Sequence, residues 1–237
     1  MKKLYVDMDG TLSRFYDDEN CLERMYEDGF FLRLAPFISV VQAVKKLIYE
    51  NCCEVYVLSC CPTEKSKKEK EDWLKKYLPE IPANHQLFLN VGEDKAKAIG
   101  HLITKDDVLL DDYNVNLRSW KNAGGTSVKL VNNINHKGLN GPLWDGFLCY
   151  GEASVNEVVE EIMAAFTSAE DAIKEIYYIE NTVDERNSRI NGYFSTFNAA
   201  KNALAGCSDW YRGKGTGKIY KVKLDCLNPH PVLVYNY

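Results

Sequence analysis

Asp7 and Asp9, one residue apart near the start of the chain, have the type and spacing suited to nucleophilic or acid–base chemistry. They follow the apolar run 4–6 and precede Gly10, a pattern that predicts a strand ending in a loop. Two carboxylates this close repel each other when buried, and a divalent cation or a shared proton usually settles the conflict. We interpret Asp7 as a nucleophile, Asp9 as a general acid and base, and Mg²⁺ as the cation. For this motif taken alone, a solvated strand end with an Asp-Gly turn is the alternative.

Further polar residues follow predicted strands in the same way. They are Ser59 after the strand 53–58, Lys95 (with Lys97 as its competitor) in the helix after the strand 86–91, and Asp111 and Asp112 at the end of the strand 107–112. In open α/β sheets, ligands bind at the carboxyl ends of the strands. The sequence therefore predicts that these residues gather around the two aspartates.

Together these positions resemble the four signatures of the haloacid dehalogenase (HAD) superfamily of phosphotransferases. The first signature is Asp7-Met8-Asp9-Gly10-Thr11-Leu12, and the others are Ser59, Lys95 and Asp111-Asp112. The resemblance implies that Asp7 forms an aspartyl phosphate and that Asp9 moves protons. It further implies that Ser59 and Lys95 hold the phosphoryl group, that Cys60 lines the site, and that Mg²⁺ binds Asp7, the Asp9 backbone carbonyl and Asp112, with Asp111 beside it. No basic partner lies near Cys60 in the sequence, so a thiolate nucleophile is disfavoured.

The segment 13–35 points to one branch of the superfamily. Gly29-Phe30-Phe31, followed by Leu34-Ala35-Pro36, resembles the 5'(3')-deoxyribonucleotidase branch of the superfamily. An insertion here forms a small cap in that superfamily, although the spacing alone fits an ordinary connecting helix equally well. Phe30 or Phe31 is a candidate to stack on a nucleobase, and the alternative is that both are core residues. Thr11 departs from the branch, which more often has Val at this position.

The composition indicates a globular protein of one large domain, or of one domain and a smaller one. Of 237 residues, 46% are hydrophobic and 27% charged, and the net charge of -5 argues against a general nucleic-acid coat protein. The eight cysteines form no C-x-x-C pair, so a zinc ribbon is not expected. No apolar run approaches the roughly 20 residues of a membrane helix, and no apolar signal core follows the N-terminal lysines. We therefore expect a cytoplasmic protein with reduced cysteines and no membrane partner.

Alternating strands and helices predict an α/β fold: a HAD-like, Rossmannoid, doubly wound parallel sheet with a small helical cap, followed by a small α+β C-terminal domain. The predicted domains are 1–168, with the cap insertion at about 13–35, and 170–237. The predicted sheet strands are 4–6, 53–58, 86–91, 107–112 and 126–131.

Helices are expected after Pro36, over 63–77 with Thr63 as cap, up to about 122, and over 154–168. Lys65, Lys67, Lys68 and Lys70 alternate with glutamates and are expected to form a solvated face. Asn116 is a candidate to orient Asp112. The polar, Gly-rich segment 132–150 is expected to fold over the rim of the site.

Beyond residue 170 we expect strands over 173–179, 219–224 and 232–235, with a helix over 194–204. The resemblance does not cover this part. Residues 210–223 carry five basic and no acidic residues among aromatic ones, a combination that can hold single-stranded nucleic acid or a phosphorylated ligand. The preferred interpretation is a hairpin whose edge strand is protected by lysines.

The resemblance implies a Mg²⁺-dependent phosphomonoester hydrolase whose partner is a small phosphorylated substrate. A 5'-nucleotidase acting on (deoxy)nucleoside monophosphates is the specific expectation. The alternatives are a phosphatase for sugar phosphates or nucleic-acid ends, and a non-catalytic HAD scaffold whose C-terminal part binds a partner.

Overall fold

The structure is a computed structural model that describes residues 2–135, 144, 146–167, 175–182, 193, 194, 198, 200, 216–223 and 232–236. The chain divides into two compact units, Met1–Phe166 and Thr167–Tyr237. All of the predicted site residues belong to the first unit.

The first unit is built on a six-stranded sheet in the order β3-β2-β1-β4-β5-β6. Its strands are β1 (Lys3–Val6), β2 (Glu54–Cys61), β3 (Gln86–Asn90), β4 (Asp107–Asp111), β5 (Thr126–Val131) and β6 (Phe147–Tyr150). Every neighbouring pair is parallel. This confirms the predicted doubly wound α/β sheet, because the strand order reverses beside β1 as it does in such folds.

Strand β6 corrects one prediction. The polar, Gly-rich sequence of 132–150 predicted a segment that folds over the rim of the site, whereas Phe147–Tyr150 pairs with β5, with Phe147 opposite Val128. Phe147–Tyr150 is a mostly half-buried edge strand, and its four residues are too few to stand out from the glycines and asparagines before them. Strand β2 is also longer than predicted, so Ser59 lies within the strand and not after it.

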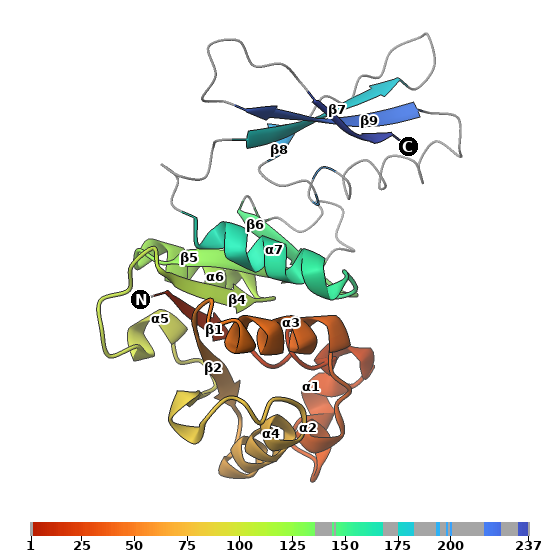
Figure 1. The fold of residues 1–237 in the computed structure, drawn as a ribbon. Coiled ribbons are helices and arrows are strands. Elements are labelled where there is room, and N and C mark those ends of the chain that lie inside the picture. The colour runs from red at the N-terminus through yellow and green to blue at the C-terminus, as the bar shows by residue number, and fades with distance from the viewer. Residues whose placement is uncertain are drawn as a thin grey trace. The chain divides into compact units, whose positions relative to one another are not determined.

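Helices follow most of the strands and cover both faces of the sheet (Figure 1). They are α3 (Ile38–Tyr49), α4 (Glu64–Tyr77), η2 (Ala83–His85), α5 (Lys95–Ala98), α6 (Asn114–Asn122) and α7 (Val155–Ala165). Helix α4 begins with the predicted cap, because the Thr63 side chain accepts from Ser66 N–H and the Ser66 hydroxyl accepts from Thr63 N–H.

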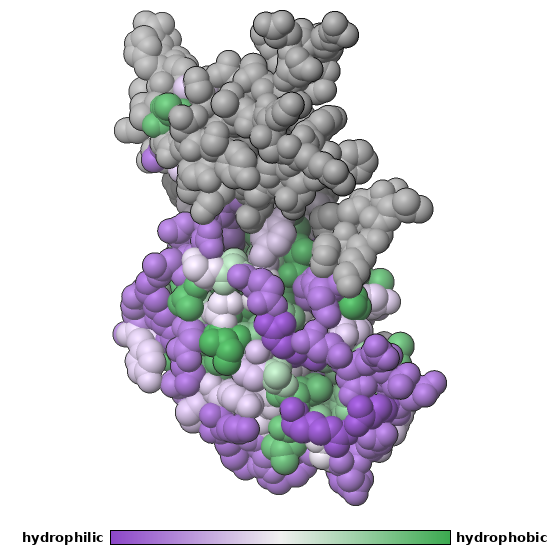
Figure 2. Space-filling view, turned by 90° about the vertical axis from the view of Figure 1, so that its right-hand side faces the viewer, coloured by the Kyte–Doolittle hydropathy of each residue, from purple (hydrophilic) through white to green (hydrophobic). Residues whose placement is uncertain are grey.

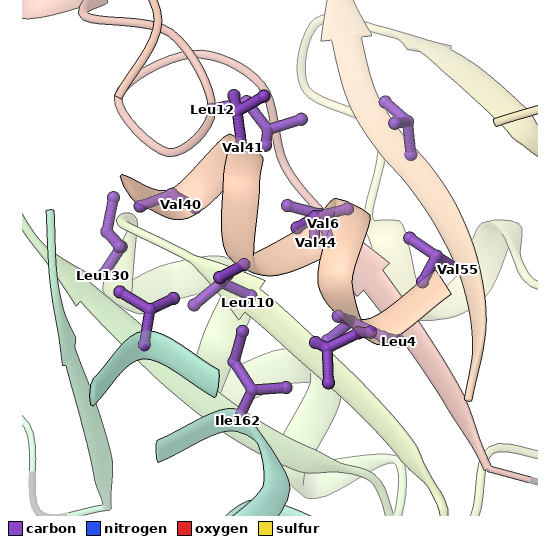
Figure 3. Packing of buried hydrophobic residues seen from close by; sticks show 14 of the residues in the cluster. Leu4, Val6, Leu12, Val40, Val41, Val44, Val55, Leu110, Leu130 and Ile162 are labelled. Atoms are coloured by element: carbon purple, nitrogen blue, oxygen red, sulfur yellow. The ribbon is translucent and has the colours of Figure 1, made fainter. Parts of the chain in front are cut away.

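The side chains of each strand alternate between two cores, as the period of a strand requires. On one face Leu4, Val6 and Leu110 pack against α3 and α7, where Val40, Val44 and Ile162 face them (Figure 3). On the other face Tyr5, Leu58 and Leu109 pack against Leu117 and Trp120 of α6. Both faces of β1 and β4 are thus buried, which explains their uninterrupted apolar sequence.

Three short helices lie between β1 and α3: η1 (Phe15–Asp17), α1 (Cys21–Arg24) and α2 (Phe30–Arg33). Their apolar side chains form a separate small core of Phe15, Cys21, Phe30, Phe31 and Leu34. Phe30 meets Phe15 and Phe31 edge to face, at ring-centroid distances of 5.6 and 5.2 Å. The phenylalanine rings of this segment contact one another and form a single cluster. We call the segment, residues 13–35, the cap.

The second unit contains an antiparallel sheet in the order β10-β9-β7-β8. Its strands are β7 (Glu175–Thr182), β8 (Tyr193–Phe194), β9 (Thr216–Lys223) and β10 (Val232–Asn236). Strand β9 lies between β7 and β10, so the expectation of a basic edge strand is wrong. Its register places Lys218 opposite Glu180 and Lys223 opposite Glu175. Residues 210–215 of the basic segment, and most of the helix predicted over 194–204, lie outside the described residues.

The face of the molecule seen in Figure 2 carries hydrophobic side chains in separate patches among hydrophilic ones. Within the described residues, no helix combines the length and the apolar character that crossing a membrane requires.

Asp107, at the amino end of β4, makes the stability of the fold depend on pH. Burial raises the pKa of its carboxyl group, but hydrogen bonds from Thr104 and His101 outweigh burial and leave the pKa below its usual value. A lowered folded-state pKa stabilises the protein above the unfolded value of about 3.9, and this contribution disappears as the pH falls through the folded pKa.

We therefore expect Asp107→Asn to lower the free energy of unfolding by about 1–2 kcal/mol at pH 7. The difference from the parent protein should shrink as the pH falls below about 4, because the unfolded parent chain takes up a proton there before the folded carboxylate does. Urea unfolding at pH 7 and pH 3.5 measures both. An equal loss at the two pH values would show that the charge of Asp107 contributes nothing.

Candidate active site

The predicted site residues meet at the carboxyl ends of β1, β2 and β4. Asp7 follows β1, Ser59 lies near the end of β2, and Asp111 ends β4 with Asp112 next to it. The order of the sheet reverses between β1 and β4, where open α/β sheets leave a crevice for ligands. A cavity of about 840 Å³ opens there, and Asp7, Asp9, Ser59, Cys60, Lys95, Asp111 and Asp112 are among the residues that line it.

The loop after β1 is wound tightly around one carbonyl group. Met8 O accepts hydrogen bonds from Leu12 N–H and Ser13 N–H, at 2.9 and 2.8 Å, and from the Ser13 hydroxyl. Gly10 has φ +79°, and a Cβ atom there would lie 2.6 Å from Asp112 Oδ2. Glycine is therefore required at this position, both for the left-handed backbone and for the close approach of the loop to Asp112.

Lys95 is the cation at the centre of the site. It is buried, and its Nζ lies 2.6 Å from Asp7 Oδ1 and 2.7 Å from Asp111 Oδ2. Burial lowers the pKa of Lys95, but the carboxylates of Asp111 and Asp7 raise it more, so the ammonium stays charged. Asp94 caps α5 by accepting from Ala96 N–H and thereby fixes the start of this short helix. Lys97, the competing candidate, is exposed.

Asp111 and Asp112 differ in what surrounds them. Both oxygens of Asp111 are occupied: Oδ1 accepts from Tyr113 N–H, and Oδ2 accepts from Lys95 and Asn116. Asp112 Oδ2 accepts from the Asn132 amide at 3.0 Å, and no ion pair to Asp112 occurs in the described part of the chain. The suggestion that Asn116 orients Asp112 is wrong, because Asn116 holds Asp111 and Asn132 holds Asp112.

Asp112 thus carries a carboxylate that the chain leaves poorly compensated. Burial and the neighbouring charges of Asp111 and Asp7 raise its pKa well above the ordinary value. Carboxylate oxygens of Asp7, Asp111 and Asp112 lie within 4.8 Å of one another. Clustered, hard oxygen donors with unbalanced negative charge fit a divalent cation such as Mg²⁺. Because Asp111 already has its partners, Asp7 and Asp112 are the side chains available to hold it.

Asp9 is paired with a lysine that was not among the predicted site residues. Lys70 Nζ lies 2.6 Å from Asp9 Oδ2, 3.1 Å from Ser59 Oγ and 2.7 Å from the carbonyl oxygen of Cys60. Burial raises the pKa of Asp9 and outweighs the opposing charge of Lys70. Burial likewise raises the pKa of the Cys60 thiol, which keeps it neutral.

The expectation that Lys70 belongs to a solvated face is wrong, since its side chain is fully buried. The signal for burial was present in the sequence. Lys70 precedes Trp73 and Leu74 by three and four residues, so a helix places all three on one face. Trp73 and Leu74 are also fully buried. The density of charge over 63–77 concealed this stripe.

The cap supplies the apolar wall of the cavity through Phe15, Tyr16, Leu22, Met25 and Phe31. Phe30 and Phe31 were the two candidates to stack on a nucleobase, and Phe31 lines the cavity. Phe30 is fully buried in the small aromatic core of the cap and does not belong to the lining. Phe30 is therefore a core residue, which is the alternative that the sequence left open.

Neither a scan against protein-family models nor a search of curated proteins gives a match to this sequence. Among solved structures, the chain is similar to D,D-heptose 1,7-bisphosphate phosphatase from Burkholderia thailandensis, with 12% sequence identity and a TM-score of 0.48 over 69% of this chain and 99% of that one. It is also similar to a HAD family hydrolase from Deinococcus radiodurans R1, solved with bound phosphate and sodium, with 12% identity and a TM-score of 0.38 over 62% and 85% of the two chains. The function is therefore inferred from the residues of the site.

Replacing Lys95, the buried ammonium group of the site, should destabilise the folded protein. We expect Lys95→Met to lower the free energy of unfolding by about 3–5 kcal/mol, because it leaves buried carboxylates without a partner. The matched control Lys97→Met, on the same helix but exposed, should stay within about 0.5 kcal/mol of the parent. Urea unfolding measures both, and equal stabilities of the two variants would contradict the role of Lys95.

A divalent cation should stabilise the first unit. We expect Mg²⁺ at about 100 times its dissociation constant to add about 2.7 kcal/mol and to raise the melting temperature. Asp112→Asn should remove this response, because a ligand and its charge are lost. Glu93→Gln, an exposed carboxylate that also lines the cavity, should keep it. A scanning calorimeter detects the shift, and an unchanged response in Asp112→Asn would place the cation elsewhere.

Proposed function

We propose that this chain is a phosphomonoester hydrolase of the HAD type, working through an aspartyl phosphate on Asp7. One observation carries the proposal: a nucleophilic carboxylate, a second carboxylate suited to proton transfer, and a buried lysine line one cavity at the carboxyl edge of the sheet. The roles given to these residues are those that the resemblance to the HAD superfamily implies.

In the first step the Asp7 carboxylate attacks phosphorus, and the bond from phosphorus to the leaving oxygen breaks. Asp9, protonated, donates its proton to that oxygen, so that a neutral alcohol departs. The raised pKa of Asp9 favours the protonated form that this step requires. Ser59 and Lys95 line the cavity, and the proposal assigns them the binding of phosphoryl oxygens.

In the second step the roles reverse. Asp9, now a carboxylate, takes a proton from water, and the resulting hydroxide attacks phosphorus of the aspartyl phosphate. The bond between phosphorus and the Asp7 oxygen breaks, which releases phosphate and restores both carboxyl groups. A cation held by Asp7, the Asp9 carbonyl and Asp112 would supply charge neutralisation for the phosphoryl group.

For the substrate we propose a nucleoside 5'-monophosphate. The cavity is lined partly by carboxylates and partly by aromatic and aliphatic cap side chains, among them Phe31 and Met25. A polar phosphate with a flat, largely apolar base matches this division. Sugar phosphates and phosphorylated nucleic-acid ends are the alternative substrates, and they offer less apolar surface to the cap.

The test of the activity is phosphate release by the full chain with Mg²⁺, from nucleoside monophosphates, sugar phosphates and 5'- or 3'-phosphorylated oligonucleotides. We expect Asp7→Asn to abolish release from every substrate, by about 10³-fold or more, because the amide is not a nucleophile. Circular dichroism should show an intact fold.

Turnover by Asp7→Asn at the parent rate would contradict the assigned nucleophile. Absence of release by the parent protein from the whole panel would favour a non-catalytic scaffold. A preference for sugar phosphates would retain the hydrolase and overturn the nucleotide proposal.

A further inference from the structure

Helix α4 carries two consecutive charged residues, Glu69 and Lys70, that are both withdrawn from water. Glu69 has an exposed fraction of 9% and Lys70 of 0%. Charged side chains are rarely this buried unless specific partners hold them, because desolvation costs free energy. Neither residue lines the cavity, so direct contact with a substrate does not account for their burial.

Lys70 uses its whole hydrogen-bonding capacity within the protein. An ammonium group has three donors, and Nζ has three acceptors, in Asp9, Ser59 and Cys60, at 2.6–3.1 Å. No donor is left for a phosphoryl oxygen. The contacts instead fix the Asp9 carboxylate relative to the Ser59 hydroxyl.

Glu69 makes the corresponding contacts with the cap. Its Oε1 accepts from Gly29 N–H at 2.6 Å, and its Oε2 accepts from Phe31 N–H at 3.1 Å. Further along α4, Trp73 Nε1–H donates to Leu34 O at 2.8 Å. Helices α2 and α4 lie side by side in Figure 1. Both oxygens of one carboxylate thus hold the backbone of the cap.

The two sets of contacts meet at Phe31. Its amide is held by Glu69, and Lys70 Nζ lies 4.6 Å from the centroid of its ring. A cation at this distance from an aromatic face is attracted to it. Phe31 also lines the cavity, so one turn of α4 fixes a wall of the substrate cavity and the acid–base carboxylate together.

We propose that Glu69 and Lys70 are positioning residues through which α4 holds the cap and the Asp9 carboxylate in one fixed arrangement. The kinetic part rests on the proposed phosphatase function. The contacts of Glu69 with the cap do not, and they can be tested separately.

For Lys70 the decisive variable is the leaving group. An alkoxide must be protonated as it departs, whereas p-nitrophenolate departs readily without a proton, and kcat/KM reports the first phosphoryl transfer. We expect Lys70→Met to lower kcat/KM for a nucleoside monophosphate about 100-fold, and for p-nitrophenyl phosphate less than about 5-fold. Lys68→Met, exposed on the same helix, is the control. Equal losses with both substrates would overturn the role of Lys70.

A double-mutant cycle guards against misfolding. Asp9→Asn combined with Lys70→Met removes both partners of the buried ion pair, and so leaves no unpaired charge from that pair. If Lys70 acts through Asp9, adding Lys70→Met to Asp9→Asn should change kcat/KM by less than about 3-fold. A further loss as large as in the parent background would show that Lys70 acts independently of Asp9, against the proposal.

For Glu69 the direct readout is amide hydrogen exchange of residues 29–34. We expect Glu69→Gln to speed exchange about 10-fold, because one carboxylate acceptor becomes an amide donor. KM for a nucleoside monophosphate should rise about 10-fold with kcat nearly unchanged, since the cap wall loosens. Glu71→Gln, the adjacent carboxylate paired with Lys68, is the control. Unchanged exchange in Glu69→Gln would overturn the proposed hold on the cap.

These measurements separate two failures. If the parent protein releases no phosphate from any substrate, the proposed function fails, while hydrogen exchange still decides whether Glu69 holds the cap. If the parent is active and Lys70→Met shows no leaving-group dependence, the function stands and the positioning role fails.

Discussion

Four carboxylates at one edge of a parallel sheet must be compensated, and much of the first unit is arranged to do so. Asp7, Asp9, Asp111 and Asp112 come from the ends of β1 and β4, which are adjacent in the sheet. Isolated buried charges of one sign would unfold the domain or remain protonated. Compensation comes from helices that follow two other strands, so the charge balance of the site depends on α4 and α5 being correctly placed.

The four carboxylates do not have equal cationic partners, and this difference bears on what each can do chemically. Lys95 serves both Asp7 and Asp111, while Lys70 serves Asp9. Asp112 receives an amide hydrogen bond from Asn132 and no cation among the described residues. Asp112 is therefore the least compensated of the four carboxylates, which suits its side chain to hold a cation. Each carboxylate has its own environment, which is what distinct roles in one reaction demand.

The sequence predicts the parts of this structure that depend on local patterns. Apolar runs mark β1, β4 and β5, and the residues after them lie in the site because parallel strands end at one edge. The partners of those residues depend on tertiary packing. Lys70 was hidden by the charges around it, and Asn132 lies in a segment without periodicity. Strand β6 was missed because pairing with β5, and not its own composition, decides that it is a strand.

The interlocked rings of the cap bear on how this site can change during evolution. Phe15, Phe30 and Phe31 contact one another, so replacing any one of them disturbs the other two. Met25 lines the same cavity and packs against this cluster, whereas Leu22 lines the cavity from outside the cluster and is 68% exposed. A substitution at Leu22 should therefore alter the cavity wall at little cost in folding free energy. The cap thus combines a rigid aromatic frame with one adjustable position, through which the shape of the cavity can change while the carboxylates at its edge keep their partners.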